Sequence, residues 1–382
     1  SVLKQFMPDT NMPTESVLLE TLDNCSSEIA AKIVSMCPAL CKASNQIRRR
    51  MEECGDFFRA EVTCTDPSGD FKLGLMSIAS YSRITSLDFS FAKLDLDDMI
   101  CLCSVLEHPQ FSSLTFLCLH NGSICVESAG YLGSALTHCR GLKGLDLGYN
   151  EMKNDGASNL AHEMLHWTST TLETLNVNQN MMGDVGLNAF IASFCNTHHQ
   201  TLVDLHCAQN FVSDLGVKHL ALALQNTPWF SLVWLDLSEN YVSNVGTKLL
   251  AESLQMGCCP VLETLDIGDN IITDDGANSM AAMLLSKHSS TLTELILGGN
   301  NISDIGATFM ADSLRRSEYI ALTSLNLRRN EIGNAGAGKL VEALRSRNCT
   351  SLKRLNLLGN DVNPRQRPYV PKTVEQCRIF CA

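Results

Sequence analysis

Acidic residues recur in this chain at a fixed interval. Asp236 and Asp266 are 30 residues apart, and each lies between two apolar residues. The equivalent position returns in ten segments, as Asp88, Cys118, Asp146, Asn176, His206, Asp236, Asp266, Ile296, Asn326 and Asn356. Neighbouring carboxylates about 5 Å apart repel each other unless a cation or a basic partner neutralises them. We interpret this row as a candidate binding surface.

Aromatic and charged residues stand beside the row. Trp234 occupies a position that holds Thr174 and Thr264 in other segments, so packing of a core does not require it. An exposed aromatic side chain next to carboxylates is typical of a protein-binding site. The candidate partner-binding residues are Phe116, Asp146, Tyr149, His206, Trp234, Asp236, Glu239, Asp266, Asp269, Arg328, Arg329 and Arg354. We expect a partner protein with a basic patch opposite the middle of the row and an acidic patch opposite the arginines.

No motif for catalysis is found in the sequence. It contains no P-loop, no G-x-S-x-G, no H-E-x-x-H and no dinucleotide-binding glycine fingerprint. His198 and His199 are adjacent, so their side chains diverge, and we interpret them as solvated. The sequence therefore predicts that the protein is not an enzyme and binds neither a cofactor nor a metal.

The chain contains 17 cysteines, none of them in a C-x-x-C pair. Cys207 stands where other segments have Leu, Val or Ile, so we expect it to pack as a small hydrophobic residue. This pattern favours buried free thiols in a reducing compartment over a disulfide framework. A zinc site at Cys37, Cys41 and Cys54 is the alternative interpretation.

A ten-residue pattern positions these side chains. It reads leucine, two residues, leucine, one residue, an aliphatic residue, two residues, asparagine, as in TLETLNVNQN at 171–180. The asparagine returns every 30 residues from Asn150 to Asn360, after two looser copies, ITSLDFSFA at 84–92 and SLTFLCLHN at 113–121. A fixed period with this consensus predicts a solenoid of leucine-rich repeats.

The second half of each repeat is equally regular. Asp or Asn, one residue and Gly precede an apolar pattern at helical spacing, as in Asp184-Val-Gly186 and Asp214-Leu-Gly216. We expect the Asp or Asn to cap the helix by accepting an amide hydrogen bond at its start. The asparagine that ends the strand pattern should satisfy backbone groups that lose their ladder partners there.

Each repeat thus predicts one short strand and one helix, in an α/β solenoid of the horseshoe type. Parallel strands stack about 4.8 Å apart, whereas helices pack roughly 8–10 Å apart. The sheet must therefore line the concave face, with the helices on the convex face, and about ten repeats that turn some 20–25° each should exceed half a circle. The candidate partner-binding residues are predicted to lie on the concave face.

The repeat, with its motif N-x-(Ile/Val)-x-(Asp/Asn)-x-Gly-Ala-x-x-Leu, resembles the ribonuclease-inhibitor type of leucine-rich repeat over about residues 84–360. That class includes ribonuclease inhibitor, the Ran GTPase-activating protein, and repeat domains of innate sensors and ciliary proteins. The resemblance implies a non-enzymatic scaffold, including a subunit of a large ciliary or other cytoskeletal assembly. Fold alone does not fix function.

Two other functions stay open. The first is a GTPase-activating protein of the Ran type, although the tail here carries Arg365 and Arg367 and no acidic run. The second is an F-box-like substrate receptor of a ubiquitin ligase, from the faint likeness of the region between Glu28 and Met51 to an F-box. That region lacks the Leu-Pro opening and the late Trp.

Charge and hydropathy limit the partners further. The net charge is −12; residues 1–83 carry 9 basic and 11 acidic residues, and the tail from Asp361 carries 4 and 2, so the repeats hold the remaining −12. Such a surface repels phosphate backbones, which predicts no nucleic-acid partner and favours a basic protein. No run of 18 apolar residues predicts membrane insertion, and no signal peptide is visible in a sequence that begins at Ser1. We expect a cytoplasmic protein, with the cilium, the flagellar axoneme or another cytoskeletal structure as a location.

Three regions are predicted. Residues 1–83 form a mostly helical N-terminal cap, 84–360 carry the repeats, and 361–382 form a C-terminal cap or tail. Within the caps we expect helices in 14–36 and from Pro38 towards Cys54, a strand at 57–64, an extended segment at 363–371 and a short helix at 374–380.

Overall fold

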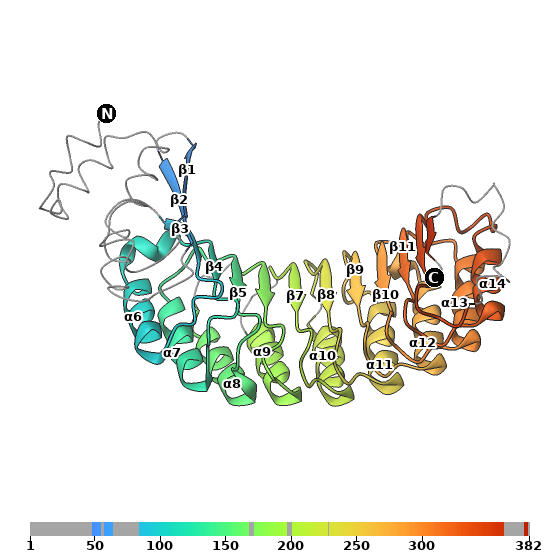
Figure 1. The fold of residues 1–382 in the computed structure, drawn as a ribbon, viewed down its shortest axis with the longest axis horizontal. Coiled ribbons are helices and arrows are strands. Elements are labelled where there is room, and N and C mark those ends of the chain that lie inside the picture. The colour runs from blue at the N-terminus through green and yellow to red at the C-terminus, as the bar shows by residue number, and fades with distance from the viewer. Residues whose placement is uncertain are drawn as a thin grey trace, which may run out of the picture. The chain divides into compact units, whose positions relative to one another are not determined.

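The computed structural model describes residues 48–54, 57–63, 84–167, 172–196, 201–227, 229–362 and 378–380 of the 382-residue chain. The chain divides into two compact units. Unit 1 comprises residues 1–150 and 162–171, and unit 2 comprises residues 151–161 and 172–382. In each unit the strands form one layer and the helices another (Figure 1).

Unit 1 begins with an antiparallel pair of strands and continues with parallel ones. Its strands are β1 (Arg48–Cys54), β2 (Phe57–Thr63), β3 (Ile84–Asp88), β4 (Phe116–Cys118) and β5 (Gly144–Asp146). Its helices are α6 (Leu96–Leu106), the short 3-10 helix η1 (Pro109–Ser113) and α7 (Val126–Leu136). Strands β2 to β5 pair in sequence order and in parallel.

The helix predicted from Pro38 towards Cys54 is wrong over Arg48–Cys54, which form β1. This strand pairs with β2 in a continuous register from Arg48 opposite Thr63 to Cys54 opposite Phe57. The pairing leaves two residues between the ends of the strands. Cross-strand pairing thus overrides the helix propensity of Arg, Met and Glu. The strand predicted at 57–64 is confirmed over 57–63, whereas the helices expected in 14–36 lie outside the described residues.

Unit 2 repeats one strand and one helix along the chain. Its strands are β6 (Thr174–Asn176), β7 (Asp204–His206), β8 (Trp234–Asp236), β9 (Thr264–Asp266), β10 (Glu294–Ile296), β11 (Ser324–Asn326), β12 (Arg354–Asn356) and β13 (Arg378–Phe380). Its helices are α9 (Asp184–Asn196), α10 (Asp214–Asn226), α11 (Asn244–Gln255), α12 (Asp274–Leu284), η2 (Lys287–Ser289), α13 (Asp304–Arg316) and α14 (Asn334–Ala343). Helix α8 (Lys153–Met164) has residues in the sequence ranges of both units.

The predicted α/β repeat architecture is confirmed. Each of the ten repeats supplies one strand, β3 to β12, and helices α6 to α14 follow the first nine of them in the described part of the chain. The helix predicted at 374–380 is wrong for Arg378–Phe380, which pair in parallel with β12 as β13. The open edge of β12 offers unpaired backbone groups, and pairing with them outweighs local helix preference. The segment expected to be extended, 363–371, is outside the described residues.

The strands alternate between core and surface as predicted. Leu235 and Leu237 are fully buried, and Asp236 between them is half-buried on the opposite side. We call the surface formed by these outward-facing strand residues, together with the turn that follows each strand, the sheet face.

In six of the repeats a buried asparagine binds backbone groups of its own repeat and of the preceding one. Asn240 Nδ2 donates to the carbonyl oxygens of Cys207, Leu237 and Ser238, at 3.0, 3.1 and 3.0 Å, and its Oδ1 accepts from the N–H of Val212 at 3.0 Å. The same arrangement recurs at Asn150, Asn210, Asn270, Asn300 and Asn330. The structural role predicted for these asparagines is confirmed, and it ties each repeat to the one before it.

The cap prediction for the Asp-x-Gly motif needs a correction, because in unit 2 the Asp binds the next repeat. Asp214 Oδ1 accepts from the N–H groups of Ser243 and Gly246, at 2.8 and 2.9 Å, at the start of α11. Its own helix, α10, is capped by Ser213, whose Oγ accepts from the N–H of Leu215 at 3.2 Å. Asp184, Asn244, Asp274 and Asp304 repeat this tie to the following helix. The stacking of the repeats brings the carboxylate closer to its neighbour's helix than to its own first turn.

Buried cysteines fill core positions. Cys207 is fully buried, as predicted from its place in the repeat, and burial raises the pKa of its thiol. Burial also raises the pKa of Cys139 and Cys259 to about 12. These thiols stay protonated at physiological pH, which suits packing and not reactivity. The zinc interpretation at Cys37, Cys41 and Cys54 falls on residues whose side chains are outside the described part.

Candidate functional site

The row of Asp and Asn residues on the sheet face has a structural task. Asp236 Oδ1 accepts from the N–H of Ser238 at 3.0 Å, and Asp266 Oδ1 accepts from the N–H of Gly268 at 2.9 Å. Asp88, Asp146, Asn176, Asn326 and Asn356 bind the amide two residues ahead in the same way. Each side chain thereby fixes the turn that leaves its strand. The preference for Asp or Asn at this position is therefore explained without a ligand, and the exceptions carry more information.

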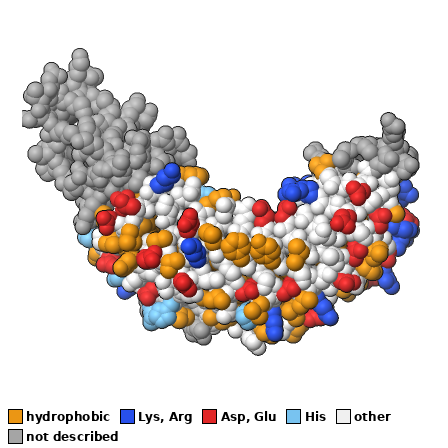
Figure 2. Space-filling view, turned by 60° about the horizontal axis from the view of Figure 1, so that its bottom comes forward, with side chains coloured by type: hydrophobic (Ala, Val, Ile, Leu, Met, Phe, Trp, Pro, Cys, Tyr) orange, Lys and Arg blue, Asp and Glu red, His pale blue; other side chains and the backbone are white. Residues whose placement is uncertain are grey.

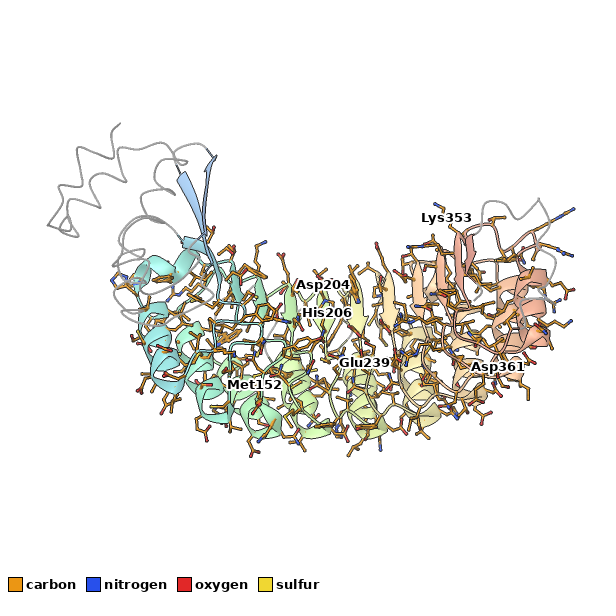
Figure 3. All side chains as sticks on the ribbon, viewed as in Figure 1. Met152, Asp204, His206, Glu239, Lys353 and Asp361 are labelled. Carbon is orange, nitrogen blue, oxygen red and sulfur yellow. The ribbon has the colours of Figure 1, made fainter. Side chains whose placement is uncertain are left out.

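One exception, His206 on β7, belongs to a cluster in unit 2. The ring of Trp234 meets the ring of His206 edge-on, with centroids 5.1 Å apart and an interplanar angle of 63°. His206 Nδ1 lies 3.8 Å from Asp236 Oδ2. Trp234 pairs across the strands with Asp204, whose Oδ2 accepts a hydrogen bond from Thr174 Oγ1 at 3.0 Å. Asp204 and His206 project from the same short strand (Figure 3).

Trp234 is the exposed member of this cluster. Its side chain is 42% exposed, although tryptophan usually buries most of its surface in a monomeric protein. The His206 ring packs against its edge, and His206 in turn contacts Asp236. A half-exposed tryptophan offers a large apolar contact area with only two rotatable side-chain bonds to order when a partner binds.

Asp266, on β9, has two carboxylate neighbours, Asp236 and Asp269. Its pKa is raised to about 7, first because burial penalises the charged form and then because Asp236 and Asp269 add negative charge. The N–H of Gly268 and the guanidinium of Arg328 act in the opposite direction. A cation brought to this part of the sheet face would favour the ionised form of Asp266.

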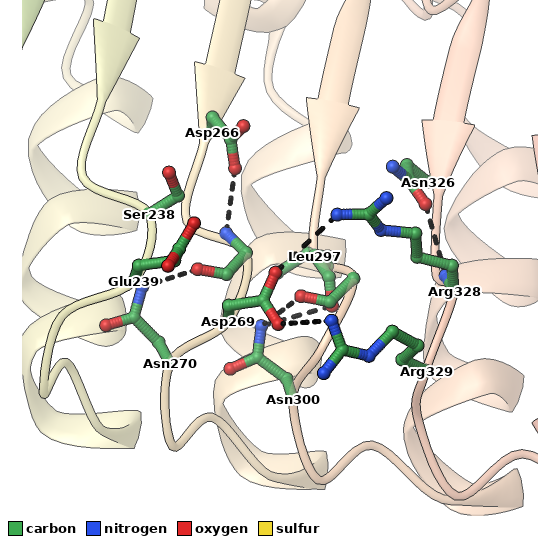
Figure 4. A network of polar contacts seen from close by, with 12 residues as sticks. Ser238, Glu239, Asp266, Asp269, Asn270, Leu297, Asn300, Asn326, Arg328 and Arg329 are labelled. Carbon is green, nitrogen blue, oxygen red and sulfur yellow. Dashed lines mark hydrogen bonds and ion pairs between the residues drawn. The ribbon is translucent and has the colours of Figure 1, made fainter. Parts of the chain in front are cut away.

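Asp269 is already paired within the protein. Its carboxylate lies 3.4 Å from Arg329 Nη1 and 3.7 Å from Arg328 Nη2 (Figure 4). These arginines belong to the second repeat beyond that of Asp269, so the pair passes over the intervening repeat at Gly299. A Cβ atom at Gly299 would stand 2.0 Å from Asp269 Oδ1. Glycine at this position therefore makes room for the ion pair.

The acidic patch expected on a partner opposite the arginines stays a prediction. Within the protein, Arg328 and Arg329 both contact Asp269. Glu239 also has a partner, since its Oε2 accepts from Gln209 Nε2 at 2.7 Å. Arg354 is exposed at the start of β12.

Unit 1 carries the other three predicted residues. Asp146 Oδ1 lies 3.6 Å from His120 Nδ1, and the His120 ring packs against Tyr149 with centroids 4.7 Å apart. Phe91 meets the other side of His120 at 5.5 Å. The ring of Phe116 lies over Gly144, where a Cβ atom would meet it at 2.5 Å. Tyr149 and Phe116 are exposed, as expected.

The twelve predicted residues thus fall into two sets, three in unit 1 and nine in unit 2. Within unit 2 the structure brings together His206, Trp234 and Asp236, and separately Asp269, Arg328 and Arg329. Sequence reasoning missed His120, Gln209 and Asp204. His120 could have been found, because it stands two residues after Cys118, where most other repeats have small residues such as Gly148 and Ser238 and none has an aromatic ring.

No helix in the described part has the length and apolar character needed to cross a membrane. Among the described residues, no group of three or more His, Cys, Asp or Glu side chains is arranged to hold a metal ion.

One family model agrees with the repeat architecture. The family model described as Leucine Rich repeat matches residues 138–161, 168–190, 258–281, 288–311 and 321–341. An internalin from Listeria monocytogenes has a similar structure, at 17% identity and a TM-score of 0.48, covering 99% of this chain and 96% of that one. A leucine-rich repeat protein from Leptospira interrogans is similar at 16% identity and a TM-score of 0.38, covering 84% and 89%. No curated protein matches the chain.

Proposed function

Because this chain is built of leucine-rich repeats, we propose that it is a non-enzymatic scaffold that binds a partner protein on the sheet face of unit 2. Trp234 is the observation that carries the proposal. It is a half-exposed aromatic ring, in edge contact with His206, at a position where other repeats have smaller residues such as Thr174, Asp204 and Thr264. Residues of this kind dominate the binding energy of protein interfaces.

Charge around Trp234 indicates what kind of surface the partner presents. Asp204, Asp236 and Asp266 lie on β7, β8 and β9, and Glu239 follows on the next turn. Burial, and after it the charges of Asp236 and Asp269, raise the pKa of Asp266. A basic partner side chain nearby would lower this pKa, so binding and ionisation of Asp266 favour each other. We therefore propose a partner with a basic patch. The pairing of Arg328 and Arg329 with Asp269 makes a separate acidic patch on that partner unnecessary.

The proposal extends to the repeat subtype and the setting. A full α-helix follows each strand from β6 to β11, and this supports assignment to the ribonuclease-inhibitor type. Membership of a larger assembly, of the ciliary or cytoskeletal kind, rests on the resemblance in repeat subtype.

The test uses the full chain as bait, followed by mass spectrometry of captured proteins. Trp234→Thr restores the residue type of the sister repeats, and Asp236→Asn with Asp266→Asn removes two charges but keeps the amide-binding oxygen that Asn326 supplies elsewhere. Both variants should fold and lose the captured partner, and Asp236→Lys with Asp266→Lys should lose it as well. Capture by the parent chain should weaken with salt, because the attraction is between charges. A partner that survives both the Trp234→Thr and the charge changes would refute the proposed surface.

A further inference from the structure

A second exposed row of residues lies away from the predicted site. The residue after each buried asparagine is Met181, Phe211, Tyr241 and Ile271 in four successive repeats of unit 2. Their side chains are 44%, 50%, 53% and 50% exposed. We call these four residues the apolar strip. Figure 2 shows hydrophobic side chains gathered in a band over adjacent repeats.

The strip is held rigidly by the backbone. The N–H of Phe211 donates to the carbonyl of Met182, that of Tyr241 to Val212 and that of Ile271 to Val242, at 2.6, 2.8 and 3.1 Å. The rings of Phe211 and Tyr241 stack with centroids 6.1 Å apart and an interplanar angle of 17°. Four large apolar side chains are therefore about half exposed in four successive repeats. A contiguous exposed apolar patch of this kind marks an interaction site.

Acidic residues surround the strip. The same position in the flanking repeats holds Glu151 on one side and, beyond Asn301, Glu331 on the other, and both are exposed. Glu239 and Asp269 stand two residues before Tyr241 and Ile271, and Asp275 is exposed at the start of α12. Arg328 and Arg329, in the repeat of Glu331, contact Asp269.

The charges and the backbone hydrogen bonds together select the occupant. A second copy of this chain would bring acidic flanks against acidic flanks, which disfavours self-association. The 6.1 Å between the stacked rings lies between the advance of one helical turn, about 5.4 Å, and the distance between side chains on one face of an extended strand, about 6.8 Å, so the spacing admits both. An added strand would also need free backbone groups, but the N–H groups of Phe211, Tyr241 and Ile271 already donate to the preceding repeat, and this favours a helix.

We propose that the apolar strip binds an amphipathic α-helix of a partner protein, with one apolar residue per turn over each of the four repeats and with Lys or Arg on both sides of its apolar stripe. Peptides and proteins are commonly recognised in this way, with anchors at i, i+4, i+7 and i+11. The strip is separate from the proposed surface around Trp234, so each can fail without the other.

The experiment measures binding of helical peptides to the full chain by fluorescence anisotropy. Two peptides of about 18 residues carry the same leucine stripe, one flanked by lysines and the other by glutamates, and both are long enough to be helical. The lysine peptide should bind, and the glutamate peptide should bind at least about tenfold more weakly. Phe211→Ser with Tyr241→Ser should weaken binding of the lysine peptide by about tenfold or more, since both anchors are lost.

Two controls isolate the strip. Tyr319→Ser removes an aromatic residue of unit 2 that is exposed to a similar degree, and Trp234→Thr alters the other surface; both should bind the lysine peptide as the parent chain does. Equal binding of the two peptides, or full binding to the Phe211→Ser, Tyr241→Ser variant, would overturn the proposal. So would sedimentation data in which the parent chain dimerises and that variant does not, because the occupant would then be a second copy.

Discussion

In unit 1, helix α6 is capped from within its own first turn, whereas in unit 2 helix α11 is held by Asp214 of the preceding repeat. Asp95 Oδ1 accepts from the N–H of Asp98 at 2.8 Å, and Asp98 Oδ2 accepts from the N–H of Asp95 at 3.4 Å. The next helix of unit 1, α7, is closed in the same local manner by Ser128, whose Oγ accepts from the N–H of Cys125 at 2.9 Å. Local caps stabilise one helix each, whereas the ties of unit 2 also hold neighbouring repeats together.

The difference between local caps and ties across repeats explains why the Asp-x-Gly motif contains glycine. Gly216 stands where α7 has Ser128, at the third helical residue, and a Cβ atom at Gly216 would come within 2.6 Å of Asp184 Oδ1. The glycine therefore admits the carboxylate of the preceding repeat. In a solenoid, stability is a sum of repeat and interface contributions, so these ties should make unit 2 unfold more cooperatively than unit 1.

The largest effect is expected from Asp214→Ala. It removes the acceptor of the Ser243 and Gly246 amides and of the Ser243 hydroxyl, which should lower the free energy of unfolding by about 3 kcal/mol. Hydrogen exchange should accelerate at the start of α11, in the following repeat, and not at the start of α10.

The chain offers matched controls for this change. Asp214→Asn should be nearly neutral, because Asn154 and Asn244 make the same tie in their repeats. Asp95→Ala in unit 1 should cost only about 1 kcal/mol and affect α6 alone. Faster exchange in α10 rather than α11 would contradict the proposed coupling.

The second-largest effect is expected from the ionisation of Asp266. On the sheet face of unit 1, Asp146 lies beside His120, whereas in unit 2 Asp266 lies near the carboxylates of Asp236 and Asp269. The pKa of Asp266 in the folded chain is about 7, above its ordinary value of 3.8, so the folded state holds the proton more tightly than the unfolded state. The free energy of unfolding must therefore fall as pH rises from about 4 to about 7, and this contribution should be constant above that window.

Asp266→Asn tests this sign. The amide oxygen can still accept from Gly268, as Asn326 and Asn356 do for their turns, but it cannot ionise. Denaturation at pH 8 should show the variant to be more stable than the parent chain by about 2 kcal/mol. This is less than the free energy that corresponds to the whole pKa shift, because the carboxylate keeps some contact with water. The gain should shrink towards pH 4, and a gain that is equal at both pH values would exclude this explanation.

A smaller effect is expected from Gly216→Ala. Alanine favours a helix by about 1 kcal/mol over glycine, but here its Cβ would displace the Asp184 carboxylate from the amides it binds. We expect a net loss of about 1–2 kcal/mol in the free energy of unfolding, measured by denaturant titration. Gly338→Ala in α14 is the control, because a Cβ atom there meets nothing within 4 Å, and it should stabilise the chain.

The fold could be predicted because the same strand-and-helix pattern recurs in every repeat. Leu235 and Leu237 against Asp236 fix which side of the strand is buried, and Asn240 fixes where the strand ends. The target of Asp214 could not be predicted in this way, since a cap for its own helix and a tie to the next have the same spacing in the sequence. Only the stacking distance between repeats decides between them. The errors at β1 and β13 have a related origin, because pairing with another strand decides their structure and leaves no periodic pattern in the short segment itself.

The candidate site was less predictable than the fold. Trp234 was identified because it departs from its sister repeats, and the same comparison could have found His120. The reach of Arg329 to Asp269 was not visible, because it depends on the missing side chain at Gly299, in a repeat to which neither residue belongs. Variation at a repeated position indicates where function can lie, but it does not indicate which variants contact one another.

The smallest effect should come from the ion pair between Asp269 and Arg329, which has no equivalent among the described residues of unit 1. Arg329 is largely exposed, so solvent and salt screen the attraction. A double-mutant cycle with Asp269→Asn and Arg329→Met should give a coupling of less than about 1 kcal/mol that fades as salt is raised. Arg328→Met should then leave part of the coupling to Arg329, because each arginine contacts the carboxylate separately. A coupling of several kcal/mol that does not respond to salt would mean that the pair is shielded from water. The acidic part of the sheet face would then be a rigid structural feature and not a surface available to a basic partner.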